Sequence, residues 1–108
     1  MATNRIKQLQ DFLKDDPDDN FSRFALALEY QKENRLNDAL EIFSGIRKSS
    51  PDYVGVYYHL GKLYEKLDQP DNALETYKAG IAIAQQQNDQ HAANELQQAK
   101  EELQIENE

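Results

Sequence analysis

The sequence predicts an all-α fold of antiparallel helix pairs, and three observations predict it. Apolar residues recur at helical spacing, and no stretch shows the two-residue alternation of a strand. Glycine and proline are scarce, at 4 and 3 residues, so they interrupt the helical pattern at few points. The chain also matches itself after a shift of 34 residues, which predicts a helical repeat. The matching pairs are Leu26 with Leu60, Ala27 with Gly61, Tyr30 with Tyr64, Ala39 with Ala73, Leu40 with Leu74, Glu41 with Glu75, and Phe43 with Tyr77.

Six helices are expected, and their ends have local causes. Pro17 and Pro51 end helices because proline disfavours helical geometry in the residue before it. Asn34 and Asp68 suit the left-handed conformation that a tight turn between two helices needs. Pro70 fits the first turn of a helix, where its missing N–H costs nothing. The expected ranges are roughly 4–14, 20–33, 36–48, 52–67, 70–86 and 89–106.

Composition excludes several classes of protein. The 108 residues carry 12 Lys and Arg against 20 Asp and Glu, a net charge of −8, which argues against binding to duplex nucleic acid. The absence of cysteine excludes disulfides, thiolate metal sites and cysteine nucleophiles. No apolar run is long enough to cross a bilayer, and the first residues show no secretory core. We therefore expect a cytoplasmic protein with no cofactor, no metal, and neither nucleic acid nor membrane as a partner.

The two helix pairs resemble the tetratricopeptide repeat (TPR) family. Its repeat has a large residue at position 4, Leu at 7, small residues at 8 and 27, Tyr at 11, Ala at 20, an aromatic at 24 and Pro at 32. Repeat 1 departs from this pattern at Arg23 and Ile46, and repeat 2 departs only at Gln85. The matching residues are Leu26, Ala27, Tyr30, Ala39, Phe43 and Pro51 in repeat 1, and Tyr57, Leu60, Gly61, Tyr64, Ala73, Tyr77 and Gly80 in repeat 2.

The resemblance implies one TPR-like domain over residues 1–108, folded as a superhelix of helix-turn-helix units. Repeat 1 would span 20–53 and repeat 2 would span 54–87. A half-repeat helix in 4–17 would precede them, and a solubilising capping helix in 88–108 would follow.

The resemblance also implies a binding groove, because the family lines a concave face with the first helix of each repeat. The side of these helices that faces away from the core carries aromatic and aliphatic residues, and exposed apolar surface marks interaction sites. We therefore expect a non-enzymatic module, or scaffold, that binds a peptide or helix of another protein. The lysines of the groove would favour an acidic segment. The candidate groove residues are Phe24, Leu28, Lys32, Tyr53, Tyr58, Lys62 and Lys66.

Two alternatives remain open at this point. Phe21, Phe24 and Leu28 would also be explained by packing against the N-terminal helix or the chain's own ends. The same apolar stripe would also serve a self-associating structural protein, a homodimer or larger homo-oligomer joined through the groove or the helix ends.

Other sites are disfavoured. His59 and His91 are the only histidines, and neither has an acid or serine partner at a recognisable spacing, so no catalytic residue is expected. The aspartates around Pro17 lack the glycine and distal glutamate of a calcium loop. TPR domains that grip the C-terminal tails of Hsp70 and Hsp90 use Lys, Arg and Asn at five places. In this chain Phe24, Leu28, His59, Asp89 and Ala93 occupy those places, so such tails are disfavoured as partners.

Overall fold

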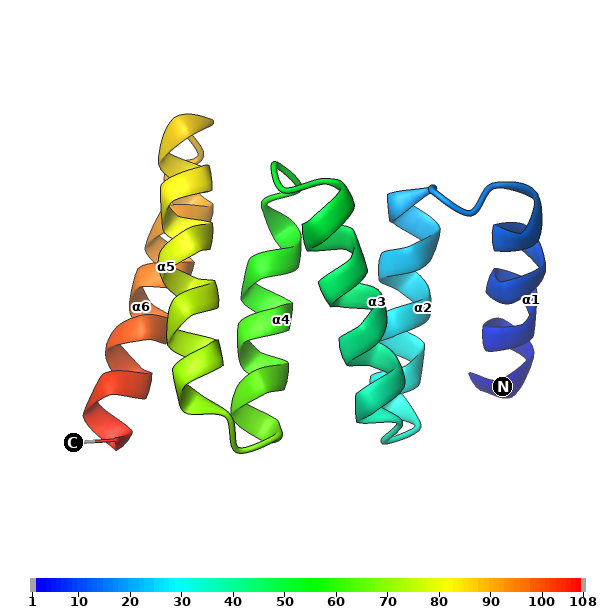
Figure 1. The fold of residues 1–108 in the computed structure, drawn as a ribbon, viewed down its shortest axis with the longest axis horizontal. Coiled ribbons are helices and arrows are strands. Elements are labelled where there is room, and N and C mark those ends of the chain that lie inside the picture. The colour runs from blue at the N-terminus through cyan, green and yellow to red at the C-terminus, as the bar shows by residue number, and fades with distance from the viewer. Residues whose placement is uncertain (1, 108) are drawn as a thin grey trace. The chain divides into compact units, whose positions relative to one another are not determined.

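The protein is an assembly of six α-helices, and the computed structural model describes residues 2–107, leaving out the side chains of Ala2 and Thr3. No strand occurs in this part of the chain, so the predicted all-α class is confirmed. Successive helices within each unit run antiparallel (Figure 1). The first compact unit, Met1–Ser49, contains α1–α3, and the second, Ser50–Glu108, contains α4–α6. The helices are α1 (Ala2–Asp15), α2 (Asn20–Lys32), α3 (Leu36–Ser49), α4 (Gly55–Lys66), α5 (Pro70–Gln86) and α6 (Gln90–Glu106).

Three tight turns join helices by the same local device. Asn34, Asp68 and Asn88 adopt positive φ angles of 59°, 59° and 56°, which confirms the left-handed conformation predicted for the first two. In each turn the next N–H bonds to a carbonyl five residues back, and this satisfies the end of the preceding helix. These bonds run from Arg35 to Tyr30 at 2.8 Å, from Gln69 to Tyr64 at 2.9 Å and from Asp89 to Ala84 at 2.9 Å.

The helix starts also follow from the sequence. The Asp19 carboxylate caps α2 by accepting the Ser22 N–H at 3.2 Å. Pro70 occupies the first turn of α5, as expected. Helix α4 begins at Gly55 and not near residue 52, because the chain first makes a turn in which the Tyr53 N–H donates to the Ser50 carbonyl at 2.9 Å.

The first unit has a core of small and aromatic side chains on α2 and α3, covered by α1. Tyr30 is buried, and its hydroxyl accepts a hydrogen bond from the Gln10 amide of α1 at 2.9 Å. The guanidinium of Arg35 lies 4.3 Å from the Tyr30 ring centre. The buried residues are Ile6, Leu9, Ser22, Leu26, Ala27, Tyr30, Ala39, Phe43 and Ile46.

The second unit requires glycine at two places where helices approach closely. A Cβ on Gly61 of α4 would lie 2.2 Å from the Tyr77 ring, and a Cβ on Gly80 of α5 would lie 2.5 Å from the Tyr57 Cβ. Tyr64 is half-buried and Pro51 is exposed, although both match the repeat pattern. The buried residues are Val56, Tyr57, Leu60, Gly61, Leu63, Ala73, Thr76, Tyr77, Gly80, Ala84, Ala93, Leu96, Ala99 and Leu103.

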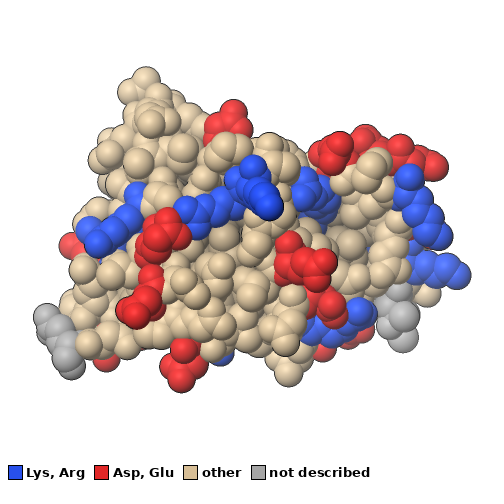
Figure 2. Space-filling model, in the orientation of Figure 1, with Lys and Arg blue, Asp and Glu red and all other residues tan. Residues whose placement is uncertain are grey.

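Charged side chains on the face drawn in Figure 2 are of both signs, and acidic ones gather over the connection between α1 and α2. This connection contains Asp16 and Asp18, which are exposed, and Asp19, the cap of α2. Within residues 2–107 no group of three or more His, Cys, Asp or Glu side chains is arranged to hold a metal ion. No helix in the same range has the length and apolar character needed to cross a membrane.

Candidate functional site: the α4–α6 trough

The predicted groove residues of the first unit lie on α2. Phe24 and Leu28 are half-buried, and the Phe24 ring packs edge-on against Phe43 with 5.5 Å between centroids. Phe24 is therefore shared between the surface and the core of its own helix pair. Lys32 is exposed, and its ammonium lies 3.0 Å from a carboxylate oxygen of Glu29 on the same helix.

In the second unit the structure brings two of the predicted residues together. Tyr58 and Lys62 of α4 line one wall of a hollow of ≈ 190 Å³, and α6 forms the other wall. Tyr53 lies in the turn before α4, and Lys66 is exposed at the last position of α4, so neither lines this hollow. We call the hollow the α4–α6 trough. Its lining residues are Tyr58, Lys62, Glu95, Gln98, Ala99 and Glu102.

The α4 wall is a hydrogen-bonded and charge-paired network. The Lys62 ammonium lies 5.7 Å from the Tyr58 ring centre and 3.9 Å from a carboxylate oxygen of Glu65. The same Glu65 carboxylate accepts a hydrogen bond from the buried Tyr77 hydroxyl. Burial, followed by this bond to Glu65, raises the pKa of Tyr77 above its usual value near 10. Lys62 is thus held by its own helix, and its charge is compensated there.

The α6 wall presents polar side chains above a small apolar floor. Glu95, Gln98 and Glu102 are exposed, whereas Ala99 between them is buried. The Gln98 amide donates to the Glu102 carboxylate at 3.0 Å. In the described part of the chain neither glutamate forms an ion pair. The two carboxylates of the trough therefore have no ion-pair partner among the described residues.

The α6 residues are the part of the site that the sequence analysis missed. Extending the period of 34 placed the third repeat's contact positions at Asp89 and Ala93, but Asp89 caps α6 and Ala93 is buried. Helix α5 has 17 residues against 14 in α3, so the period does not continue into α6. The buried stripe of α6 at 96, 99 and 103 was visible in the sequence, and the residues flanking it at 95, 98 and 102 would have identified this wall.

His59 lies beside the trough and is half-buried. Its ring meets the Tyr58 ring edge-on, with 5.8 Å between centroids. Burial lowers the pKa of His59 below its usual 6.5, and the negative charge of Glu95 opposes this only in part. His59 is therefore neutral near pH 7 and adds no positive charge to the trough.

The charge of the trough differs from the expectation based on the groove lysines. That expectation was a positive surface, but the lining has one lysine and two glutamates, and Glu65 pairs with the lysine. That expectation counted the lysines of the first helices and left out the carboxylates of Glu95 and Glu102 on α6.

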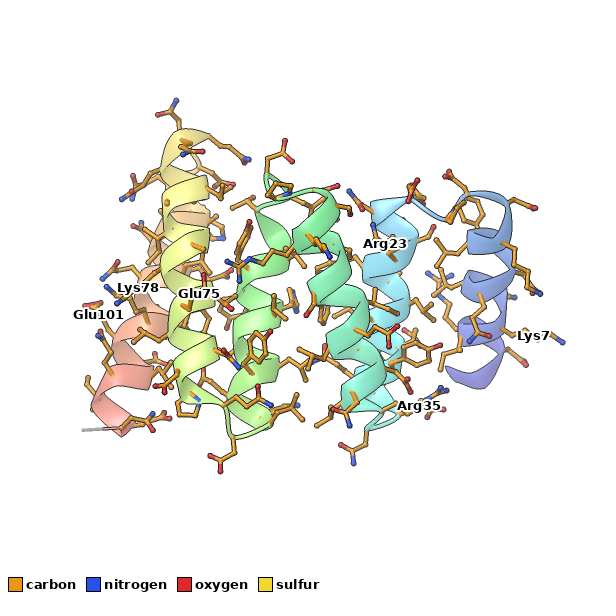
Figure 3. All side chains as sticks on the ribbon, in the orientation of Figure 1. Lys7, Arg23, Arg35, Glu75, Lys78 and Glu101 are labelled. Atoms are coloured by element: carbon orange, nitrogen blue, oxygen red, sulfur yellow. The ribbon has the colours of Figure 1, made fainter. Side chains whose placement is uncertain are left out.

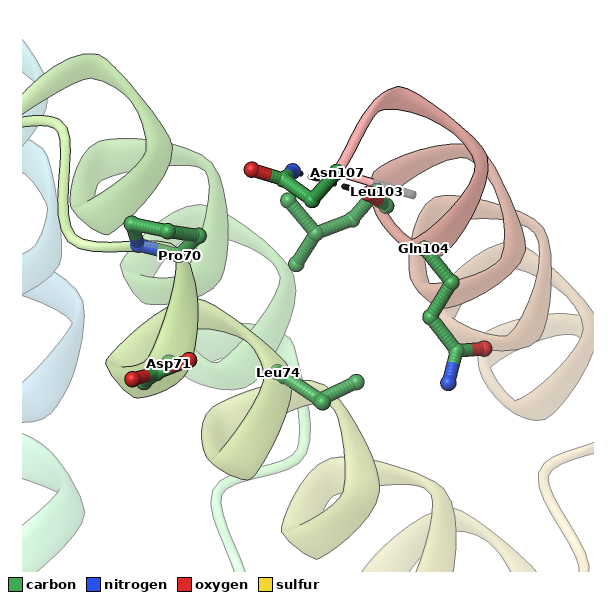
Figure 4. A pocket seen from close by; sticks show the side chains of 6 residues that line it. All are labelled: Pro70, Asp71, Leu74, Leu103, Gln104 and Asn107. Atoms are coloured by element: carbon green, nitrogen blue, oxygen red, sulfur yellow. Dashed lines mark hydrogen bonds between the residues drawn. The ribbon is translucent and has the colours of Figure 1, made fainter.

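A second hollow of ≈ 530 Å³ lies between the start of α5 and the end of α6 (Figure 4). Leu74 and Leu103 give it an apolar base, and Asp71, Gln104 and Asn107 surround them with polar side chains. The Asn107 amide donates to the Leu103 carbonyl at 2.9 Å, so it closes the end of α6. This hollow is a candidate contact surface at the helix ends.

The chain is similar to known repeat proteins in sequence and in fold. A tetratricopeptide repeat model matches residues 30–95, more than half of the chain. A TPR repeat-containing protein of Methanocaldococcus jannaschii is 37% identical over 67 residues, which cover 62% of this chain and 21% of that protein. The chain therefore spans about a fifth of the length of this curated relative.

Two solved structures show the likeness in three dimensions. A tetratricopeptide repeat domain protein of Salinibacter ruber is 48% identical with a TM-score of 0.78, covering 82% of this chain and 89% of that one. The TPR2B domain of yeast Sti1, solved in complex with pHsp70, has a TM-score of 0.88 at 19% identity and covers 97% of this chain and 84% of that one. The second likeness is one of fold alone.

Proposed function

We propose, since this chain belongs to the tetratricopeptide repeat family, that it is a cytoplasmic protein-binding module whose α4–α6 trough receives a peptide or helix of a partner. Repeats of this family are generally interaction modules and not enzymes. One observation carries the proposal: an aromatic ring, a buried alanine floor and a rim of polar side chains from two helices surround one hollow. Such a combination offers apolar contact and directional hydrogen bonding to a bound segment.

The trough suits a side chain of the partner better than a whole small ligand. Its ≈ 190 Å³ is below the about 300–1,000 Å³ typical of small-molecule pockets. The Sti1 neighbour was solved as a complex with pHsp70, which supports a role for this fold in binding segments of other proteins. The other predicted groove residues are part of the same proposal: Phe24, Leu28 and Lys32 in the first unit, and Tyr53 and Lys66 in the second.

We propose that the C-terminal tails of Hsp70 and Hsp90 are not the partners. The family's tail-binding domains use lysine, arginine and asparagine around the terminal carboxylate. The α4–α6 trough instead presents Glu95 and Glu102, which would repel it.

Affinity capture from the native cell lysate tests the binding role. The test variant is Tyr58→Ala, which removes the aromatic contact in the trough and leaves its charge unchanged. Leu74→Ala is a matched control, because it truncates a large apolar side chain of α5 that does not line the trough; its neighbour Glu75 is labelled in Figure 3. Circular dichroism checks that all three proteins keep their helices.

The expected result is a protein that the wild type and the control retain and the trough variant loses. Equal retention by all three proteins would move the binding site away from Tyr58 and would overturn this assignment. Loss from the control alone would move the site to the outer side of α5.

Self-association is the second candidate function, and the hollow between α5 and α6 favours it. Its base of Leu74 and Leu103 would accept an apolar side chain from the helix end of another copy. Light scattering after gel filtration separates the two functions. A dimer that Leu74→Lys converts to a monomer would support self-assembly, whereas a wild-type monomer at high concentration would exclude it.

A further inference from the structure

The second unit carries nearly all of the net charge of the chain. Residues 50–108 contain eleven Asp and Glu against four Lys, a net charge of −7, whereas residues 1–49 have a net charge of −1. The potential around the second unit is therefore negative, and it attracts cations before any specific contact forms.

Within this unit the trough is arranged so that its negative charge stays available. The lysine of the trough lining, Lys62, has an ion-pair partner on its own helix, Glu65, at 3.9 Å. Glu95 forms no ion pair in the described residues, and Glu102 accepts only a neutral amide hydrogen bond from Gln98. His59 beside them is neutral at physiological pH, because burial lowers its pKa.

Besides negative charge, a site for an organic cation benefits from an aromatic face, and the Tyr58 ring supplies one. The centre of this ring lies 5.7 Å from the Lys62 ammonium, and both side chains line the trough, so the ring already has a positive group as a neighbour. The buried Ala99 between the two glutamates offers a small apolar surface for the methylene stem of a long basic side chain.

We propose that the α4–α6 trough recognises a lysine or arginine side chain of the partner segment, held between the Tyr58 ring and the carboxylates of Glu95 and Glu102. This inference rests on the proposed function and names the chemistry of its partner. The stem of the basic side chain lies on Ala99, and its charged end pairs with the two carboxylates. An acidic side chain at the same place would meet two like charges and is rejected.

A nuclear magnetic resonance titration tests this charge preference directly. The ¹⁵N-labelled chain is titrated at constant ionic strength with N-acetyl-L-argininamide, with N-acetyl-L-lysinamide, and with the corresponding amide of glutamate. The test variant is Glu95→Gln with Glu102→Gln. The matched control is Glu101→Gln with Glu106→Gln, which removes the same charge from exposed α6 positions outside the trough.

The expected result is a set of saturable shifts at Tyr58, Glu95, Ala99 and Glu102 with the two basic probes and not with the glutamate probe. The test variant should bind the basic probes about fivefold more weakly than the wild type, because two exposed ion pairs to the probe are lost. The control should stay within about twofold of the wild type, and raising the salt concentration should weaken binding to the wild type.

Two results would overturn the inference. Shifts in the trough with the glutamate probe alone would show the opposite charge preference, and equal weakening in test variant and control would show a general charge effect. Neither result touches the binding role itself, because lysate capture tests that role without assuming the charge of the partner. Conversely, the basic probes could bind selectively while the wild type and the Tyr58→Ala variant capture the same proteins from the lysate. That result would keep the charge preference of the trough and reject the trough as the site where the partner protein binds.

Discussion

The two helix pairs differ in side-chain chemistry and size at two pairs of positions that are 34 residues apart. In the first pair Arg23 stands on α2 and Ile46 on α3, whereas in the second pair Tyr57 stands on α4 and Gly80 on α5. Gly80 leaves room for the Tyr57 ring, since a Cβ there would meet Tyr57 at 2.5 Å. The Arg23 guanidinium instead turns to the helix end and donates to the Ser49 hydroxyl at 3.0 Å. In the first pair the close approach is to Gly45, where a Cβ would lie 2.9 Å from the Arg23 guanidinium. The glycine that leaves room for the neighbouring side chain thus stands one position earlier in the first pair than in the second.

The second difference between the pairs concerns polarity. Phe43 of the first pair corresponds to Tyr77 of the second, and only Tyr77 has a hydroxyl, which donates to Glu65. Glu65 in turn pairs with Lys62 on the surface that lines the trough. One added oxygen thus connects the core of the second pair to its candidate binding surface, and the first pair has no such connection through Phe43. Three predictions, each with its own substitutions, test this comparison of the two pairs.

The largest effect is expected from truncating the leucine that both pairs share. Leu60 is 1% exposed and Leu26 is 6% exposed. Leu60→Ala should lower the free energy of unfolding by about 2–5 kcal/mol, because it removes buried methylene groups and leaves a cavity. Leu26→Ala should cost less, since its side chain is less completely enclosed. Thermal and urea denaturation, followed by circular dichroism, measure the free energy of unfolding of both variants. A larger loss of stability for Leu26→Ala than for Leu60→Ala would contradict the comparison.

A smaller effect is expected where the pairs differ by one methyl group. Gly61 in the second pair corresponds to Ala27 in the first. Gly61→Ala should destabilise the protein by about 1–3 kcal/mol, because the added Cβ would lie 2.2 Å from the Tyr77 ring, which is buried and cannot move aside. Urea denaturation measures the loss.

Gly55→Ala is the matched control for Gly61→Ala. It makes the same change on the same helix, but its nearest neighbour would be the Tyr53 ring at an ordinary 3.8 Å. Gly55→Ala should therefore leave stability unchanged or raise it slightly, since alanine favours the helix. Equal losses at the two positions would show that the close approach of Tyr77 is not the cause.

The sequence predicted the helix pairs and most of their core, because these depend on local signals that repeat. The left-handed turns at Asn34 and Asp68 and the glycine at position 61 were each readable from one residue type at one spacing. Burial did not follow the pattern everywhere, since Tyr64 is only half-buried and Pro51 is exposed. Pattern position fixes which way a side chain points, but neighbouring elements decide how far it is covered.

The site was predicted less well than the fold, for a physical reason. Tyr58 and Lys62 could be placed on one stripe of α4 from their spacing. Glu95 and Glu102 were missed because the period of 34 was extended into α6, whereas α5 is longer than α3 and shifts α6 out of that period. The charge of a surface between two helices depends on both registers, so the expected lining was incomplete without the α6 carboxylates.

The smallest effect is expected from removing the hydroxyl that distinguishes Tyr77 from Phe43. Tyr77→Phe should cost about 1 kcal/mol at pH 7, because Glu65 loses one hydrogen bond and keeps Lys62. Urea denaturation at several pH values measures the difference in unfolding free energy between the wild type and Tyr77→Phe as a function of pH.

The pH dependence gives the sharper part of the same prediction. The folded pKa of Tyr77 is raised, so below pH 10 the phenol is neutral in both folded and unfolded chains and its full contribution is present. Above pH 10 the unfolded chain loses the phenolic proton first, and the stability of the wild type falls as the pH rises. Tyr77→Phe lacks this loss, so the stability difference between the two proteins should shrink from pH 7 to above pH 10. A constant stability difference over this range would show that folding does not raise the pKa of Tyr77, neither by burial nor through Glu65. The connection from the Tyr77 hydroxyl through Glu65 to the trough would then have to be abandoned.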